Sequence, residues 1–248
     1  MSEKNYYKLT MAFDGSNYVG WQIQKNGPSI HAEMMKAGSG FLEDGFTITG
    51  CSRTDSGVHA LGYVALLVTE RDIKERGVAG AFNAHLPRDI VVHHVKQVTK
   101  DFHPRYTAKN KHYRYRIYNN NYRIPQFLHY AHYFYKDLNV ESMDEAAKAF
   151  VGTHDFVGFS STKTTVEDTV RTIESCCVTK VDHHIQIDIV GNGFLYNMVR
   201  IIVGSLLEVG TGKIEVHDMA NILASKDRNK AKKTAPACGL TLVGLEYM

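Results

Sequence analysis

The stretch FTITGCSRTDSGVHALGYVALLV, residues 46–68, contains the local pattern from which the fold can be predicted. Residues 46–51 and 61–68 are rich in apolar and β-branched side chains, which is typical of strands. The residues between them, 52–57, are small or polar and indicate a loop. The stretch therefore predicts two strands joined by a loop that carries Asp55, with Arg53 two residues before it.

On both sides of this stretch, helical segments alternate with strand-like segments that often come in pairs. Alternating or apolar runs predict further strands at residues 7–13, 90–98, 111–119, 170–179, 184–190 and 240–247. Helical patterns predict helices at residues 29–42, 72–84, 140–151, 194–209 and 216–224, the first of them capped by Ser29. Strands in pairs argue against a parallel, doubly wound sheet. We therefore expect an α+β fold of two similar halves, residues 1–105 and 106–248.

The composition is that of an ordinary globular protein, with 44% hydrophobic and 22% charged residues. No run of about 18 apolar residues is present, so we expect no membrane span. The first residues, MSEKN, lack the pattern of a secretion signal. The four cysteines form no C-x-x-C motif and two of them are adjacent, which favours a reduced, cytoplasmic protein over a disulfide scaffold.

Residues 102–136 contain seven Lys or Arg, four His, eleven aromatic residues and no Asp or Glu. Cations neutralise phosphates and flat rings stack on unpaired bases, so this window favours binding to single-stranded or loop RNA. The alternating YRYRIY at residues 113–118 equally fits a Tyr-rich strand with one face in the core, and both interpretations can hold. A second basic cluster, residues 226–233, fits either a solvated surface or a further RNA contact.

Two residues stand out as candidates for chemistry. Asp55 lies in the predicted loop between Arg53 and His59, although an aspartate before Ser-Gly is also typical of an Asx turn. Arg200 lies in an otherwise apolar helical pattern, on one stripe with Tyr196. A buried guanidinium there needs a carboxylate or phosphate partner, unless Arg200 is a structural or snorkelling residue.

Other classes of site are disfavoured. The histidines lack metal-ligand spacing, so we expect no metal site. Gly191-Asn192-Gly193 offers a G-x-G pattern, but Tyr196 stands where the dinucleotide-binding fingerprint needs Gly or Ala. Neither a G-x-S-x-G nor a Walker A motif occurs, which disfavours acyl hydrolases and phosphate-loop enzymes.

Several motifs resemble those of the bacterial tRNA pseudouridine synthase A (TruA) family. SRTDSGVHA at residues 52–60 is similar to the catalytic R-T-D-x-G-V-H motif of that family. Six more family-like segments occur in order: FDGSNYVGWQ (13–22), FHPRYTA (102–108), KHYRY (111–115), GTHDF (152–156), FLYNMVRIIVG (194–204) and ACGL (237–240). Two departures are Ser52, where the family often has Gly, and His31, where many members carry Gln.

The resemblance implies the pseudouridine synthase fold, with two pseudo-symmetric α/β halves, a mixed, mainly antiparallel sheet and a central cleft. It implies isomerisation of uridine to pseudouridine in the anticodon stem-loop of tRNA, at positions 38, 39 and 40. It also implies a homodimer in which one tRNA contacts both subunits. No metal, redox cofactor or nucleotide cofactor is expected.

The resemblance also assigns roles to individual residues. Asp55 is expected to be the nucleophile, acting at uracil C6 or at ribose C1′, and Arg200 to keep its carboxylate ionised. Tyr113 is expected to stack on the uracil and to take part in proton transfer at C5. Arg53 is expected to fill the space that the flipped base leaves. Further substrate contacts are expected at His59, Arg105 and Arg114.

Two alternative functions stay open from the sequence. One is a synthase of the same fold that acts on a different RNA, which the departures at Ser52 and His31 allow. The other is a tRNA-binding folding chaperone without catalysis. The presence of both Asp55 and Arg200 argues against the chaperone, because a degenerate member is expected to lose one of them.

Overall fold

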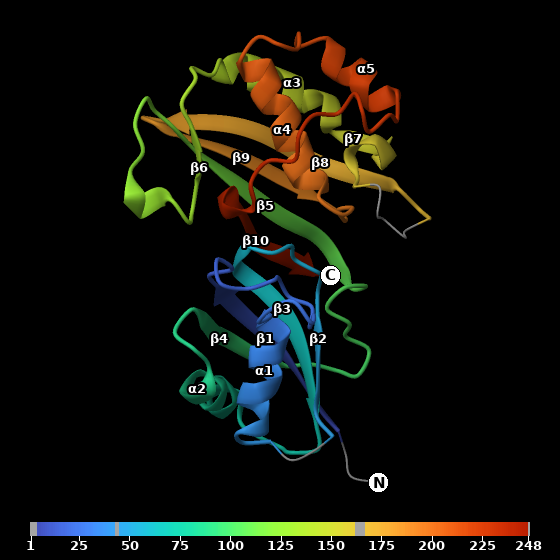
Figure 1. The fold of residues 1–248 in the computed structure, drawn as a ribbon. Coiled ribbons are helices and arrows are strands. Elements are labelled where there is room, and N and C mark those ends of the chain that lie inside the picture. The colour runs from blue at the N-terminus through green and yellow to red at the C-terminus, as the bar shows by residue number, and fades with distance from the viewer. Residues whose placement is uncertain (1–3, 43–44, 162–166, 248) are drawn as a thin grey trace. The chain divides into compact units, whose positions relative to one another are not determined.

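The computed structural model describes residues 4–42, 45–161 and 167–247 (Figure 1). The chain divides into two compact units, each with its own set of internal contacts. The first unit comprises residues 1–109 and 242–248, and the second comprises residues 110–241. Within the described residues, no helix has both the length and the apolar character needed to cross a membrane.

Among the described residues of the first unit, a set of strands is combined with two helices, α1 (Ile30–Ser39) and α2 (Glu75–His85). Its strands are β1 (Asn5–Phe13), β2 (Thr47–Gly50), β3 (His59–Thr69), β4 (Ile90–Gln97) and β10 (Leu240–Tyr247), of which the part from Leu242 belongs to this unit. The strand order is β4-β1-β3-β10, and β2 also pairs with β3. β1 runs antiparallel to both β3 and β4, so that Leu9 lies opposite Ala65 and Val95.

The core of the first unit follows from two sequence periodicities. β1 alternates strictly, and its buried side chains are Tyr7, Leu9, Met11 and Phe13. α1 begins where Ser29 accepts a hydrogen bond from the N–H of Ala32 at 3.3 Å, which confirms the predicted cap. The apolar face of this helix, including Ile30 and Met34, is buried in the same core.

The second unit has the strand order β5-β9-β8-β7. Each strand in this order runs antiparallel to the next. These strands are β5 (Ala108–Asn119), β7 (Gly152–Asp155), β8 (Val170–Val181) and β9 (His184–Gly191). The short β6 (His132–Phe134) runs parallel to β5. A mixed, mainly antiparallel sheet in an α+β chain is therefore confirmed.

The part of the second unit that the structure describes has three α-helices: α3 (Val140–Ala147), α4 (Met198–Gly210) and α5 (Asp218–Ala224). Figure 1 shows α3 and α4 lying over one face of the sheet. α4 is buried almost all round, as its apolar sequence indicates. At Gly204, a Cβ atom would lie 1.7 Å from the carbonyl oxygen of Lys233, so only glycine allows α4 to approach this segment.

Some expected boundaries were wrong. The helix expected to start at residue 194 begins at Met198, because Asn197 adopts a left-handed backbone with φ of 62° and ends the preceding turn. The helix expected at residues 140–151 is α3 followed by a 3-10 turn, Lys148–Phe150. β6 and β7 were not predicted, since they have only three and four residues.

Candidate active site and nucleic-acid interface

The loop that carries Asp55 joins β2 to β3 in the first unit and is held by the segment 18–21. The backbone N–H of Trp21 donates to Thr54 Oγ1 at 3.0 Å. The N–H of Gly57 and the hydroxyl of Ser56 both donate to the carbonyl oxygen of Tyr18, each at 3.2 Å. An Asx turn at Asp55 would use the Gly57 N–H, which here serves the neighbouring segment. The loop is therefore fixed from outside, and Asp55 is half-buried within it.

Two features make the supporting segment rigid. Gly20 has a φ of 98°, and a Cβ atom there would lie 2.1 Å from the carbonyl oxygen of Thr54, so the close approach requires glycine. The hydroxyl of Tyr18 donates to Asp89 Oδ1 at 2.8 Å. Burial, and to a lesser degree the bond to Asp89, raise the pKa of Tyr18, so this hydroxyl stays protonated as a donor.

The other predicted residues of this loop differ in exposure. Arg53 is exposed, next to the buried Thr54. His59 starts β3 and is only 4% exposed. The N–H of Gly15 donates to His59 Nδ1 at 3.1 Å, and Asp14 Oδ1 lies 3.1 Å from the same nitrogen. His59 thus contacts the turn after β1, and a substrate contact by His59 stays a prediction.

β5 places Tyr113 and Arg114 on opposite faces of the sheet in the second unit. Tyr113 is 7% exposed, and its ring meets Phe194 edge-on with centroids 5.1 Å apart. Arg114 belongs to the polar face, where its Nε donates to Asp188 Oδ1 at 2.9 Å. His112 Nε2 lies 2.5 Å from the same oxygen. Because strand side chains alternate, Tyr113 and Arg114 cannot share one pocket, which the sequence motif did not show.

Arg200 lies in the first turn of α4 and is half-buried. Its Nε donates to the carbonyl oxygen of Ala235 at 2.7 Å, and its Nη1 donates to Asn197 Oδ1 at 3.0 Å. Asn197 in turn donates through Nδ2 to Ser161 Oγ at 2.7 Å. Asn197 and Ala235 therefore set the plane of the guanidinium, and sequence reasoning missed both. Tyr196 was expected on the same helical stripe, but it lies before α4 and is 49% exposed.

Residues 102–136, called the basic window below, contain exposed aromatic rings close to cations in two places. In the first unit, Tyr106 is 75% exposed, and its ring is tilted against that of His103, with centroids 4.3 Å apart. The same ring lies 5.8 Å from the Arg105 guanidinium. In the second unit, Arg123 lies 5.0 Å from the ring centroid of Tyr133. Tyr122 and Tyr135 are exposed nearby in sequence. Exposed rings flanked by cations match the chemistry of unpaired RNA.

The basic window also contains the Tyr-rich strand that was expected to have one face in the core. Tyr113, Tyr115 and Tyr118 are buried on β5. The expected core strand is therefore confirmed for β5, and the flanking rings are exposed, while RNA binding by them stays a prediction. The C-terminal basic cluster is partly structural, since Lys226 pairs with Asp155 at 2.9 Å and Arg228 donates to two backbone carbonyls.

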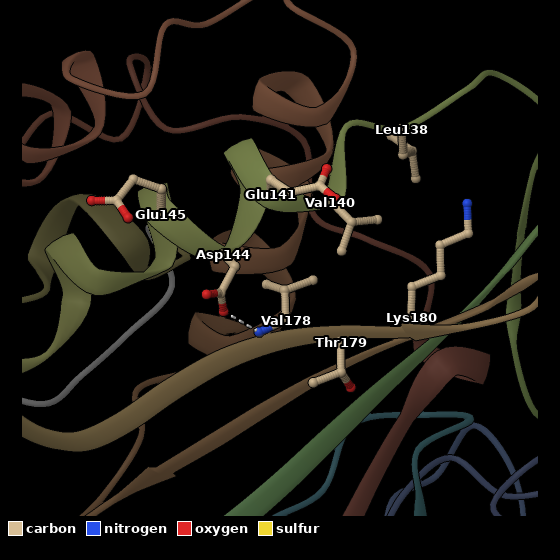
Figure 2. A pocket seen from close by; sticks show the side chains of 8 residues that line it. All are labelled: Leu138, Val140, Glu141, Asp144, Glu145, Val178, Thr179 and Lys180. Carbon is tan, nitrogen blue, oxygen red and sulfur yellow. Dashed lines mark hydrogen bonds between the residues drawn. The ribbon is translucent and has the colours of Figure 1, made fainter.

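A cavity of about 540 Å³ lies between α3 and β8 in the second unit (Figure 2). Three carboxylates from α3 line it, and one of them, Asp144, accepts a hydrogen bond from the N–H of Val178 at 2.7 Å. Lys180 is the only cation among the lining residues. An excess of carboxylates repels phosphate, so this cavity does not fit a nucleic-acid site.

Comparison with known proteins gives a consistent result. The family model described as tRNA pseudouridine synthase matches residues 9–107 and 146–248, which leaves Tyr113 between the two matched ranges. The chain is 46% identical to tRNA pseudouridine synthase A of Ruminiclostridium cellulolyticum, over 97% of this chain and 98% of that protein. It is 44% identical to tRNA pseudouridine synthase A of Acetivibrio thermocellus, with the same two coverages.

A further relative is tRNA pseudouridine synthase A 2 of Bacillus cereus, which is 41% identical over 98% of this chain and 100% of that protein. Among solved structures, a chain in the crystal structure of a Cbf5-Nop10-Gar1 complex aligns with a TM-score of 0.41 and 11% identity. That alignment covers 95% of this chain and 48% of the other, and the similarity is too low to support an argument.

Proposed function

The chain belongs to the tRNA pseudouridine synthase family, and from this membership we propose that it isomerises uridine to pseudouridine in the anticodon stem-loop of tRNA, at positions 38, 39 and 40. The observation that carries the proposal is the loop 52–57. Three hydrogen bonds to Tyr18 and Trp21 hold this loop and leave Asp55 half-buried in the middle of it. A carboxylate fixed in this way can meet a uridine in one defined orientation.

The reaction balances without a co-substrate. The bond between uracil N1 and ribose C1′ breaks, and a bond between uracil C5 and C1′ forms. The proton that leaves C5 is matched by the proton gained at N1, so neither oxidation nor reduction occurs. Asp55 acts as nucleophile at C1′ or at C6 and is regenerated in both cases. Tyr113 takes part in removing the C5 proton and contacts the uracil ring.

Arg200 is proposed to pair with the Asp55 carboxylate and to keep it ionised once uracil excludes water. The support is the way in which the second unit holds the guanidinium, through Asn197 and Ala235, at the start of α4. Such a fixed plane suits two parallel hydrogen bonds to a carboxylate.

The RNA is proposed to contact the exposed rings and cations of the basic window. Tyr106 and Arg105 offer a stacking ring and a phosphate contact in the first unit. Arg53 is exposed in the same loop as Asp55, which supports the proposal that it fills the space left by a flipped base. His59 and Arg114 are weaker candidates, since His59 is buried and Arg114 is paired with Asp188.

We extend the proposal to a homodimer in which one tRNA contacts both subunits, acting in the cytoplasm. The support is the family resemblance together with the tRNA substrate. Sedimentation equilibrium of the purified protein tests this proposal. A dimer should have twice the mass of one 27.9 kDa chain.

The test of the function is pseudouridine mapping on transcribed tRNA and rRNA fragments incubated with the purified protein. The proposal expects pseudouridine at tRNA positions 38–40, and none with Asp55→Asn. Asp101→Asn changes an exposed aspartate of the same unit and should act like the wild type. Modification of rRNA alone would favour a synthase for another RNA. Binding to tRNA without any product would favour the folding chaperone.

A further inference from the structure

Three rings are stacked in the core of the first unit, directly behind the Asp55 loop. His31 from α1 lies parallel to Trp21, with centroids 5.3 Å apart and planes at 7°. Trp21 lies on Tyr63 from β3, with centroids 4.3 Å apart and planes at 23°. At Gly50 of β2, a Cβ atom would lie 2.1 Å from the Tyr63 hydroxyl and 2.5 Å from Trp21 Cε2. The stack therefore fits tightly against its surroundings.

The stack is bonded to the loop on both sides of Arg53. The hydroxyl of Tyr63 donates to the carbonyl oxygen of Ser52 at 2.5 Å. The backbone N–H of Trp21 donates to Thr54 Oγ1 at 3.0 Å. Both bonded residues lie within three positions of Asp55, so a shift of Trp21 or Tyr63 would move the loop that carries the carboxylate.

His31 contributes to this arrangement through the face of its ring. Both ring nitrogens are buried, and neither forms a hydrogen bond with any described residue. Burial lowers the pKa of His31; the backbone of Ile48 offsets only part of this effect and forms no hydrogen bond of good geometry with the ring. Two buried ring nitrogens without hydrogen bonds are costly and call for an explanation. Its one described ring contact is the stack on Trp21.

The backbone strengthens the link between α1 and Trp21. The N–H of His31 donates to the carbonyl oxygen of Trp21 at 3.0 Å, and the N–H of Ile30 donates to that of Gly20 at 3.1 Å. The first turn of α1 is thus tied to the segment that holds the Asp55 loop. Backbone bonds do not set the tilt of the indole, whereas the rings of His31 and Tyr63 stacked on it do.

We propose that His31 is a positioning residue, whose ring face braces Trp21 so that Trp21 and Tyr63 hold the 52–57 loop and Asp55 in the reactive geometry. This inference rests on the proposed function in one respect, the role of Asp55 in catalysis. It predicts that a planar apolar ring can replace His31, because the ring face and not a hydrogen bond supplies the contact.

The experiment compares His31→Ala, which removes the ring, with His31→Phe, which keeps one, and with His94→Ala as the control on the exposed part of β4. Steady-state kinetics on tRNA give kcat and KM separately. Acrylamide quenching of fluorescence reports on Trp21 alone, because the chain has a single tryptophan. Circular dichroism confirms that each variant is folded.

For His31→Ala we expect kcat to fall about 10- to 100-fold, as misplacement of a catalytic group by a fraction of an ångström would cause. KM for tRNA should change less than about twofold, and the quenching constant of Trp21 should rise. His31→Phe should keep kcat and the quenching constant near the wild-type values. If the larger Phe ring prevents folding, His31→Gln supplies a flat amide of smaller size and takes its place.

Three outcomes would overturn the inference. The first is an unchanged kcat in a folded His31→Ala, and the second is a rise in KM alone, which would make His31 a substrate contact. The third is an unchanged accessibility of Trp21 in His31→Ala. If the wild-type protein produces no pseudouridine, the proposed function fails on its own, while the quenching data still decide whether His31 braces Trp21.

Discussion

The side-chain oxygen of Asn197 accepts a hydrogen bond from Nη1 of Arg200 at 3.0 Å, across the first turn of α4. Asn197 is also the residue whose left-handed backbone starts the helix there. One residue therefore sets the start of α4 and, together with the Ala235 carbonyl, fixes the direction of the guanidinium. The proposed pairing of Arg200 with the Asp55 carboxylate would depend on that direction.

Asn197→Gly separates these two roles, because glycine tolerates the left-handed backbone and lacks the amide. We expect the helix to form with little loss of stability, while kcat falls as the guanidinium loses one of its partners. The size of the loss should be near that of one charge-assisted hydrogen bond, about 10-fold. Thermal unfolding and kcat, measured on the same preparation, check this. An unchanged kcat would show that Asn197 serves only the helix start.

Asp55→Asn should abolish product formation and leave folding and tRNA binding largely intact, because Asn fills the same volume. Arg200→Met should also reduce activity severely, although it removes no nucleophile. Arg200→Lys should recover only part of that activity, since it restores the charge without the planar fork. Single-turnover rates and filter binding measure the two effects. Substantial product from Asp55→Asn would contradict both the nucleophile and the ion pair.

Tyr113→Phe keeps the buried ring that meets Phe194 and removes the hydroxyl. If the hydroxyl moves a proton, turnover should fall about 10²- to 10⁴-fold while tRNA still binds. Tyr113→Ala should lose binding as well. Tyr118→Phe, on the same strand, is the matched control and should turn over normally. A lower melting temperature with a normal rate would assign Tyr113 to strand packing alone.

Affinity for tRNA should fall steeply as salt rises, because cations of the basic window release counterions from the phosphates that they contact. Arg123→Ala should lower the slope of log affinity against log salt by about 0.7 if Arg123 contacts a single-stranded phosphate. Lys213→Ala is the control, since Lys213 pairs with Glu208 at 2.7 Å. If the slope of log affinity against log salt is near zero for the wild type, the basic window does not contact the RNA phosphates.

Burial lowers the pKa of His31 and of His132 below the ordinary histidine value of 6.5. As the pH drops through that value, the unfolded chain binds protons at these positions that the folded chain does not, so the free energy of unfolding falls. The free energy of unfolding should therefore be unaffected by these two histidines above about pH 7 and should fall progressively below about pH 6.5. Urea unfolding of the wild type and of His31→Phe tests this: the variant should lose less stability between pH 7 and pH 5.5. Equal losses would show that His31 titrates normally in the folded chain.

Much of the fold could be predicted because local patterns decide it. The alternation of β1 and the cap at Ser29 lie within a few residues of sequence, and both are as expected. The start of α4 could not be read in the same way. Residues 194–197 are as helix-like in composition as those that follow, and only the backbone of Asn197 ends the turn.

The loop that carries Asp55 was predictable from its own residues, but the residues that hold the loop were not. The loop around Asp55 follows from a recognisable run of residues, whereas Trp21 and Tyr18 hold it from more than 30 positions away. The pairing of Arg114 with Asp188 depends on the register of β5 with β9, 74 residues apart in sequence. Such partners are set by topology, which a single sequence does not state.

The last strand, β10, belongs from Leu242 onward to the first unit, although the whole second unit precedes it in sequence, and this order matters during protein synthesis. Residues 242–247 of β10 complete that unit: Val243 lies against Gly62 of β3, and the Tyr247 hydroxyl donates to the carbonyl oxygen of Pro104 at 2.9 Å. The ribosome therefore makes all of the second unit before it delivers the last strand of the first. The second unit, which is continuous in sequence, can mature while translation continues, whereas the unit that carries Asp55 must wait as an unfinished sheet. A nascent chain stalled before residue 242 would expose the edge of β3, which makes the late-finishing unit the one that most needs chaperone protection.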